Sequence, residues 1–197
     1  MGKVVALMSM SLDGFVADPD DGVEEVFDWY FSGDVEVTVP TGAFTFRVSP
    51  PSAERLHGLI ADVGAMLTGR RTFERAQGWE GRHPFDVPAF VVTGQVPEGW
   101  PRPGSTVRFV TDGIESAVAQ AKAAAGPKLV GVHGAQTIQA CLDAGLLDEL
   151  QIDLAAVLLG DGVRLFDRPA NAPVVLGTPT VVAGVGVTHL RYPVQTS

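Results

Sequence analysis

A short segment of the sequence, "TGRRTFE", combines residue types that bind phosphate groups. An apolar run ends at Gly69, and a helical pattern then begins with Arg70, Arg71 and Thr72. Glycine lets a ligand approach the backbone closely, and a helix N-terminus offers unpaired N–H groups to an anion. Two guanidinium groups add positive charge and forked hydrogen-bond donors. The segment therefore predicts a phosphate site, although pairing of the arginines with Glu74 or other acids explains it equally well.

A second junction of the same kind, "VGVHGAQTI", lies further along the chain. A strand pattern ends at His133 and Gly134, and a helical pattern opens with Ala135, Gln136 and Thr137. Two strand-to-helix junctions with glycine suit a molecule with two phosphate clusters, such as a dinucleotide. One of the two arginines would then bind a ribose 2′-phosphate, which favours the phosphorylated nicotinamide cofactor. The Gly-x-Gly-x-x-Gly fingerprint is absent, which disfavours an ordinary Rossmann dehydrogenase.

The elements that must position these junctions alternate between strands and helices. Short apolar runs typical of buried strands occupy residues 3–8, 64–69, 88–94, 107–113 and 128–134. Helical patterns occupy residues 49–64, 112–127 and 135–145. Such alternation predicts parallel strands joined by right-handed crossovers.

Two regions depart from this alternation. Three C-terminal runs have turns but no long helix between them, which predicts antiparallel strands added to a sheet edge; they occupy residues 149–160, 179–184 and 186–193. Residues 18–49 are rich in aromatic and acidic side chains and contain a hairpin pattern at 35–39 and 43–48. We expect this long excursion to be functional, because loops of such length in compact domains usually are.

The composition is that of a folded, acidic protein. The chain has 197 residues, of which 46% are hydrophobic and 19% charged, so we expect one domain over residues 1–197. The net charge of −9 disfavours nucleic-acid and anionic-membrane partners. The N-terminus does not resemble a signal peptide, and the single cysteine, Cys141, gives no support for an oxidising compartment. We therefore expect a cytoplasmic protein, with Cys141 packed in the core.

Five segments follow one another in an order and spacing that resembles the dihydrofolate-reductase-like superfamily. They are "SMSLDGFVA", "TGRRTFE", "FVVTG", "VHGAQTI" and "GLLDELQIDLAAVLLGDGVRLF", of which the last is the most specific. The closest branch is the reductase domain of bacterial riboflavin biosynthesis with its stand-alone relatives. The resemblance implies a three-layer α/β fold with a mixed, mostly parallel sheet flanked by helices. It also implies NADPH as the hydride donor and a homodimer.

The resemblance assigns several residues to the cofactor. It implies that Gly69 to Thr72 begin a phosphate-binding helix, that Thr93 lies near the adenosine-side phosphate or ribose, and that Gly134 to Ile138 form a pyrophosphate loop. The loop around Asp13 would lie beside the nicotinamide. The family commonly has two consecutive glycines where this chain has glycine and then Ala135. Because a Cβ disfavours positive φ, we expect a less strained backbone or a slightly shifted cofactor there.

Reduction also requires a proton, and the sequence offers acidic candidates. A carboxylate in an apolar pocket has a raised pKa and can relay a proton. We predict that Asp13 is catalytic and contacts the substrate, although Asp-Gly is also a plain turn signal. Glu54 and Trp29 are further candidates for substrate contact, Trp29 by stacking on a flat heterocycle. Alternatively, Glu54 and Arg55 face solvent, and the aromatic run around Trp29 packs its loop down or forms a dimer face.

The remaining polar residues form no recognisable site in the sequence. No second ligand stands at metal-binding spacing from His133, so no metal is expected. His57, His83 and His189 are scattered along the chain. We expect the acid pair Asp148–Glu149 to be solvated at a turn.

The leading interpretation is an NADPH-dependent reductase that transfers a hydride to a small pterin- or flavin-like heterocycle or to a sugar-phosphate-like substrate. The alternative is a non-catalytic nucleotide- or ligand-binding protein on the same scaffold. Ala135 and the lack of an unambiguous proton donor favour this alternative.

Overall fold

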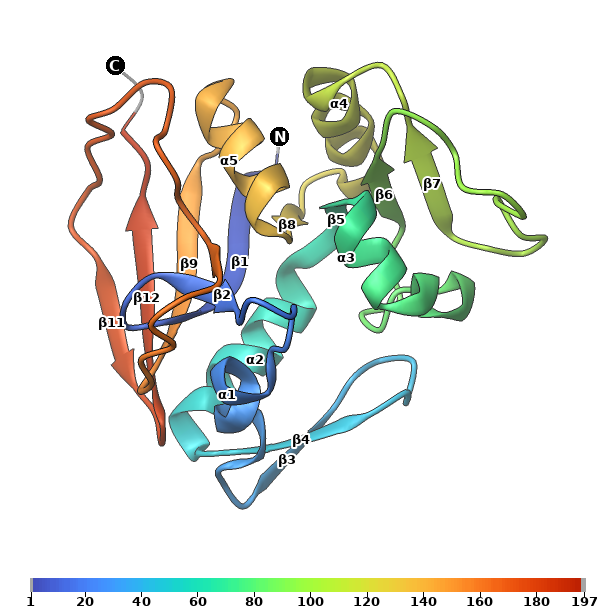
Figure 1. Ribbon diagram of the computed structural model, residues 1–197. Helices are drawn as coiled ribbons and strands as arrows, with labels where there is room; N and C mark the ends of the chain where they lie inside the picture. The colour runs from blue at the N-terminus through green and yellow to red at the C-terminus, as the bar shows by residue number, and fades with distance from the viewer. Residues whose placement is uncertain (1, 196–197) are drawn as a thin grey trace.

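An eight-stranded sheet forms the centre of the computed structural model, which describes residues 2–195 (Figure 1). The strand order is β11-β12-β9-β1-β8-β5-β6-β7. From β9 to β7 all neighbours are parallel, whereas β12 and β11 are antiparallel. The strands are β1 (Val4–Ser11), β5 (Val63–Gly69), β6 (Ala89–Val92), β7 (Val107–Val110), β8 (Leu129–Val132), β9 (Glu149–Ala155), β11 (Thr180–Ala183) and β12 (Val187–Pro193).

Helices cover both faces of this sheet and give a three-layer fold. They are α2 (Pro50–Asp62), α3 (Arg70–Arg75), α4 (Ile114–Ala125) and α5 (Ala135–Asp143). Side chains of β1 alternate between the layers, as strand geometry requires. Val4 and Ala6 pack with α4 and α5, whereas Val5 and Leu7 pack with side chains of α2 and α3. The predicted three-layer α/β architecture is confirmed.

The excursion after β1 forms a separate group of short elements beside α2. It contains β2 (Phe15–Ala17), α1 (Glu24–Phe27), a 3₁₀ turn η1 (Asp28–Phe31), and the hairpin β3 (Val35–Thr38) and β4 (Thr45–Val48). β2 pairs with β10 (Val163–Arg164), and a further short turn, η2, spans Gln77–Gly81. The hairpin extends away from the main sheet in Figure 1 and is held to α2 by an apolar cluster.

The first of the three predicted C-terminal strands lies in a different part of the sheet from the edge where it was expected. Residues 149–155 form β9 inside the sheet, parallel to β1, and not an antiparallel strand at the edge. The physical reason is α5, which acts as a crossover helix and returns the chain in the direction of β8. Only β11 and β12 are antiparallel additions.

Of the acid pair, Glu149 at the start of β9 differs from the prediction, whereas Asp148 just before it is exposed as expected. Glu149 is 4% exposed and is paired with Lys3 and with Arg191, whose Nε lies 2.6 Å from Oε2. Asp148 accepts a hydrogen bond from the N–H of Val4 at 2.6 Å. Because β9 lies between β12 and β1, the Glu149 side chain is covered by its neighbours and does not face solvent. Although burial alone would raise the pKa of Glu149, hydrogen bonds from Arg191 and Lys3 lower it.

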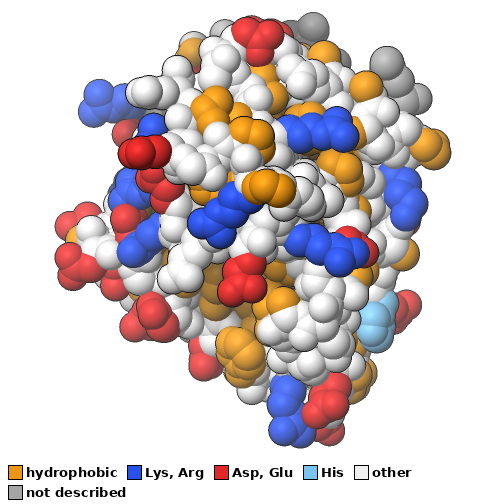
Figure 2. All heavy atoms as spheres, turned by 90° about the vertical axis from the view of Figure 1, so that its right-hand side faces the viewer, with side chains coloured by type: hydrophobic (Ala, Val, Ile, Leu, Met, Phe, Trp, Pro, Cys, Tyr) orange, Lys and Arg blue, Asp and Glu red, His pale blue; other side chains and the backbone are white. Residues whose placement is uncertain are grey.

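The remaining global features follow the composition. Cys141 is fully buried in the core, as predicted. Within residues 2–195, no helix is both long and apolar enough to cross a membrane. On the face seen in Figure 2, Lys and Arg side chains are interspersed with carboxylates, so that face carries no continuous basic surface.

Candidate active site

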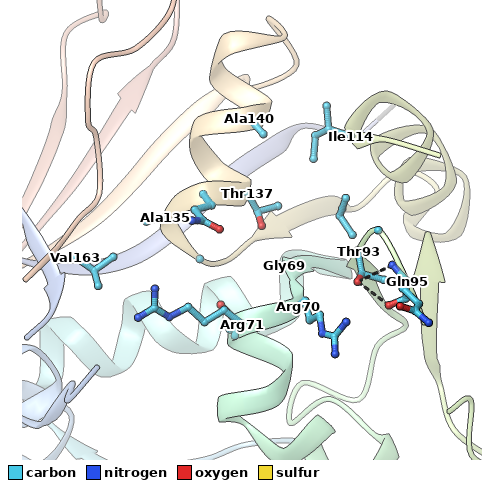
Figure 3. Close-up of a pocket in the computed structure, with 15 residues that line it drawn as sticks. Gly69, Arg70, Arg71, Thr93, Gln95, Ile114, Ala135, Thr137, Ala140 and Val163 are labelled. Atoms are coloured by element: carbon cyan, nitrogen blue, oxygen red, sulfur yellow. Dashed lines mark hydrogen bonds between the residues drawn. The ribbon is translucent and has the colours of Figure 1, made fainter. Parts of the chain in front are cut away.

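A cavity of about 660 Å³ lies beyond the carboxyl ends of β5, β6 and β8 (Figure 3). We call it the strand-end cavity. It is lined by the β5–α3 junction (Gly69 to Thr72), the end of β6 (Val92 to Gln95) and the β8–α5 junction (Gly134 to Thr137). Open parallel sheets bind ligands at this position, because strand ends and helix N-termini meet there. The structure thus brings the two predicted phosphate junctions into one site.

The two junctions pack against each other through reciprocal glycine–threonine contacts. A Cβ on Gly69 would lie 2.8 Å from Oγ1 of Thr137, and a Cβ on Gly134 would lie 2.6 Å from Oγ1 of Thr72. Gly134 also has a φ of +86°, which favours glycine. Ala135 follows as the first residue of α5, so its Cβ is on helical backbone. Of the two positions where the family commonly has glycine, only Gly134 therefore has a positive φ.

The two arginines point to opposite ends of the strand-end cavity (Figure 3). Arg70 lies on the side of Gln95, and its Nε donates to Glu74 at 2.7 Å. Arg71 extends toward the opposite side and pairs with Asp21, with 3.1 Å between Nε and Oδ2. Hydrogen bonding from Arg71 holds the pKa of Asp21 below its usual value. Each arginine therefore lines the cavity and also has an acidic partner, so both interpretations of the pair are compatible with the structure.

Thr93 lines the strand-end cavity through a local turn. Its hydroxyl donates to the carbonyl of Gln95 at 2.8 Å and accepts from the Gln95 N–H at 3.3 Å, as the dashed lines in Figure 3 show. The Thr93 side chain thus fixes the backbone that closes this end of the cavity.

A second cavity of about 500 Å³ adjoins the first, and we call it the aromatic chamber. Thr72 and Gly134 line both cavities. The excursion after β1 supplies five aromatic residues to the chamber wall: Phe27, Tyr30, Phe31, Phe44 and Phe46. Tyr30 stacks on Phe46 with 4.4 Å between ring centroids. The long excursion therefore builds one wall of the chamber, which accounts for its aromatic composition.

The chamber wall also includes Trp79, which lies in a turn of unusual backbone. Every residue from Gln77 to Gly81 has positive φ. Left-handed conformations cost free energy in residues other than glycine and tend to occur at functional sites. This turn places the Trp79 ring 5.0 Å from that of His83, between centroids.

Polar groups in the aromatic chamber are few and mostly paired. Arg55 donates from Nη2 to Oδ1 of Asp153 at 2.7 Å, and its side chain is 15% exposed. The same carboxylate oxygen lies 2.7 Å from Nδ1 of His189, which is buried. Nη1 of Arg55 is buried and has no partner among the described residues. The predicted alternative of a solvent-facing Arg55 is wrong, because α2 turns this side chain toward β9.

Two histidines lie together in the same chamber. The ring centroids of His83 and His133 are 6.3 Å apart. Burial lowers the pKa of His83 to about 3 and that of His133 to about 4, with the Asp153 carboxylate opposing the shift of His133. Both imidazoles are therefore neutral near pH 7.

Asp13 occupies a position that does not favour its predicted role. It lines neither cavity. Its carboxylate accepts hydrogen bonds from the Ser11 hydroxyl at 2.6 Å and from the N–H groups of Leu159 and Gly160 at 3.1 and 2.7 Å. These bonds, chiefly that from Ser11, lower the pKa of Asp13 to about 2. An acid that stays ionised at neutral pH cannot donate a proton, so these contacts indicate that Asp13 holds the loop.

The other predicted contact residues also lie outside the cavities or at their edge. Trp29 is 2% exposed, donates from Nε1 to the Ser9 hydroxyl at 3.1 Å and stacks behind Tyr30. Glu54 is exposed on α2 and does not line the chamber. Ile138 is fully buried within α5 and supports the β8–α5 junction from behind. For Trp29 and Glu54, substrate contact stays a prediction that these positions do not favour.

The residues that sequence reasoning missed come from distant segments. Tyr30, Arg55, His83, His133 and Asp153 meet only in three dimensions. Arg55 follows Glu54 in an ordinary charged helix surface, and the histidines have no common spacing. Only the aromatic run containing Tyr30 gave a signal.

Comparisons with known proteins identify the family and the fold of this chain. The family model described as the RibD C-terminal domain matches residues 2–192. A putative riboflavin biosynthesis protein from Shewanella sp. PV-4 is 25% identical, with a TM-score of 0.69 over 100% of both chains. The riboflavin biosynthesis reductase of Saccharomyces cerevisiae is 14% identical, with a TM-score of 0.65 over 98% of this chain and 90% of that one.

A dihydrofolate reductase from Enterococcus faecalis, solved with NADP(H), is 14% identical, with a TM-score of 0.56 over 99% of this chain and 98% of that one. At 14% identity, the Enterococcus enzyme and the yeast reductase are evidence for the fold alone. The match to the family model covers nearly the whole described chain and confirms the resemblance found in the sequence. The chain belongs to the RibD C-terminal domain family and has a dihydrofolate-reductase-like fold.

Proposed function

We propose that this protein is an NADPH-dependent reductase of a small ring-containing substrate. The observation that carries the proposal is the shared border of the two cavities at Thr72 and Gly134. One cavity has glycine junctions, helix N–H groups and arginines, which suit a dinucleotide. The other is walled by aromatic rings, which suit a flat acceptor. A cofactor extending across the border would place its nicotinamide against a ring in the chamber.

The direction of the cofactor follows from this arrangement. The nicotinamide end belongs at the border with the aromatic chamber, so the adenosine end belongs near Thr93 and Gln95. Arg70 lies on that side, whereas Arg71 points away from it and is held by Asp21 (Figure 3). We therefore assign the ribose 2′-phosphate to Arg70. Binding would require Arg70 to exchange its exposed partner Glu74 for the phosphate, and exposed pairs of this kind are weak.

The family supports this proposal, because the chain matches the RibD C-terminal domain and resembles a putative riboflavin biosynthesis protein from Shewanella. The fold is one that a yeast reductase of riboflavin biosynthesis and an Enterococcus enzyme solved with NADP(H) also have. Hydride transfer asks little of the protein beyond geometry and exclusion of water, which the adjoining cavities would provide. The homodimer and the cytoplasmic location stay predictions.

Calorimetric titration of the purified protein with NADPH and NADH tests the proposal. We expect NADPH to bind at least about tenfold more tightly, because a charged hydrogen bond to phosphate contributes roughly 1.5–3 kcal/mol. Arg70→Ala should remove this preference without changing NADH affinity. Arg75→Ala is the matched control, since Arg75 lies on the same helix but does not line the cavity. Absence of binding by either nucleotide would refute the proposal.

The non-catalytic alternative gives a different result in the same preparation. NADPH would bind with the expected preference, but its absorbance at 340 nm would not fall in the presence of any flat acceptor. The two measurements together separate a failure of cofactor binding from a failure of chemistry.

A further inference from the structure

The aromatic chamber offers no free cation to a phosphorylated substrate. Among its described lining residues, Arg55 is the single Lys or Arg side chain, and Asp153 already neutralises it. Both histidines are neutral near pH 7. Burying a phosphate dianion without a compensating charge is strongly unfavourable. The chamber is therefore suited to an uncharged ring and not to a sugar phosphate.

The tautomer of His83 is set by a backbone hydrogen bond. The N–H of Phe85 donates to Nδ1 of His83 at 3.2 Å, so Nδ1 carries no proton. In a neutral imidazole the proton must then reside on Nε2. Among the described residues, Nε2 of His83 has no hydrogen-bond partner, although the residue is only 4% exposed. The chamber wall therefore carries an N–H donor that a bound molecule can satisfy, in addition to the buried Nη1 of Arg55.

His83 lies close to the border with the strand-end cavity. Its neighbour His133 immediately precedes Gly134, which lines both cavities. A ring that contacts His83 within the chamber is thus near the place assigned to the nicotinamide. Other side chains with donors also line the chamber: Arg55, which is paired with Asp153, and Ser9, Tyr30, Thr72 and Trp79.

We propose that the aromatic chamber binds a flat, uncharged conjugated ring whose carbonyl oxygen accepts a hydrogen bond from Nε2–H of His83. This inference rests on the proposed NADPH-dependent reduction and names its substrate class. The hydride, with its electron pair, passes from NADPH to a ring carbon conjugated with the carbonyl, and NADP⁺ forms. The π electrons move to the oxygen, where the His83 N–H stabilises the negative charge. The anion then takes a proton from water.

The neutral state of His83 suits this role. A neutral imidazole donates a hydrogen bond to an oxygen as charge develops, and its protonation state does not change near pH 7. Burial maintains that state in the folded protein. No carboxylate is needed as a proton donor, which agrees with the position of Asp13.

The test compares two uncharged bicyclic probes, of which only the first has a carbonyl oxygen that can accept a hydrogen bond. Quinolin-2-one and naphthalene are titrated calorimetrically against the protein without nucleotide. We expect wild type to prefer quinolin-2-one about tenfold, the upper range of a single neutral hydrogen bond. His83→Leu should abolish the preference, and His83→Gln, which retains an amide N–H, should restore most of it. His57→Leu is the control, because His57 is exposed on α2 outside the chamber.

Two outcomes would overturn the proposal even if His83→Leu does not fold. One is an equal affinity of the wild type for the two probes. The other is binding of 1-naphthyl phosphate as tightly as quinolin-2-one, which would show that the chamber accepts a phosphate. Because these titrations contain no nucleotide, they are independent of the NADPH titration. A failure of the substrate class is thereby distinguished from a failure of the proposed reductase function.

Discussion

The strand-end cavity and the aromatic chamber share a border but are built in different ways. The strand-end cavity consists mainly of backbone and short side chains at consecutive strand ends, where each contributing segment is local in sequence. The chamber consists of large side chains from the excursion, α2, β9 and the turn at Trp79. The first is determined by sheet topology and the second by tertiary packing. This difference suggests that cofactor binding and substrate choice can be changed separately.

The largest expected effect concerns the aromatic chamber and its buried ion pair of Arg55 and Asp153. Arg55→Met leaves Asp153 charged and buried without its guanidinium, which should destabilise the protein by about 3–5 kcal/mol. Urea unfolding measures this change. Adding Asp153→Leu should recover only part of the loss, because it removes the charge that Arg55 balanced but also deprives buried His189 of its partner. If the single variant is as stable as wild type, the pair is not buried in solution.

A substitution at Gly134, in contrast, should damage the strand-end cavity. Gly134→Val places a branched side chain at a φ of +86° against Thr72, which should cost about 1–3 kcal/mol and weaken NADPH binding by more than tenfold. Calorimetry and urea unfolding measure the two effects. Gly58→Ala is the control, since an added Cβ there meets no atom within 4 Å. Unchanged nucleotide affinity in Gly134→Val would argue against the reciprocal junction as the binding site.

The pH dependence of stability tests the neutral histidines of the chamber. The pKa of His83 is about 3 in the folded protein, against 6.5 as the ordinary value. Below pH 6.5 the unfolded chain binds a proton that the folded chain does not, so stability falls as pH decreases. Between pH 7.5 and 5 this amounts to about 2 kcal/mol for His83.

We expect His83→Gln to lose about 2 kcal/mol less than wild type over the same pH interval. His57→Gln, at an exposed site, should behave like wild type. Equal pH dependence in all three proteins would mean that the His83 imidazole is solvated.

The smallest expected effect concerns Glu54, the neighbour of Arg55. Glu54→Gln should change stability by less than about 0.5 kcal/mol and leave binding of nucleotide and ring probes unaltered, because the side chain is exposed. A marked loss of ring binding would instead restore Glu54 as a substrate contact.

The fold was largely predictable because strand and helix periodicity are local properties. The strands around β5 and β8 and the helices α2, α4 and α5 lie where their apolar patterns indicated. The direction of β9 was predicted wrongly, since pairing with β1 depends on the crossover through α5. The burial of Glu149 was missed for the same reason, because its pairing with Lys3 and Arg191 depends on the position of β9 between β1 and β12.

The strand-end cavity was predictable for a related reason, whereas the chamber was not. Glycine at a strand-to-helix junction is a signal that one segment carries by itself. Arg55 and Asp153 lie on different elements, and His83 and His133 are brought together by the packing of two loops. No single segment contains information about such contacts. Asp13, conversely, was selected for its position after β1, but its carboxylate is directed to the backbone of another loop.

A crystal structure of the protein with NADP⁺ would show whether the two cavities act together. We expect the 2′-phosphate to lie within hydrogen-bonding distance of Arg70 and the pyrophosphate to contact the N-terminus of α5. We expect the nicotinamide to pass Thr72 and Gly134 and to face the aromatic chamber. A cofactor bound in the reverse direction, or with its nicotinamide outside the chamber, would contradict the joint role of the two cavities.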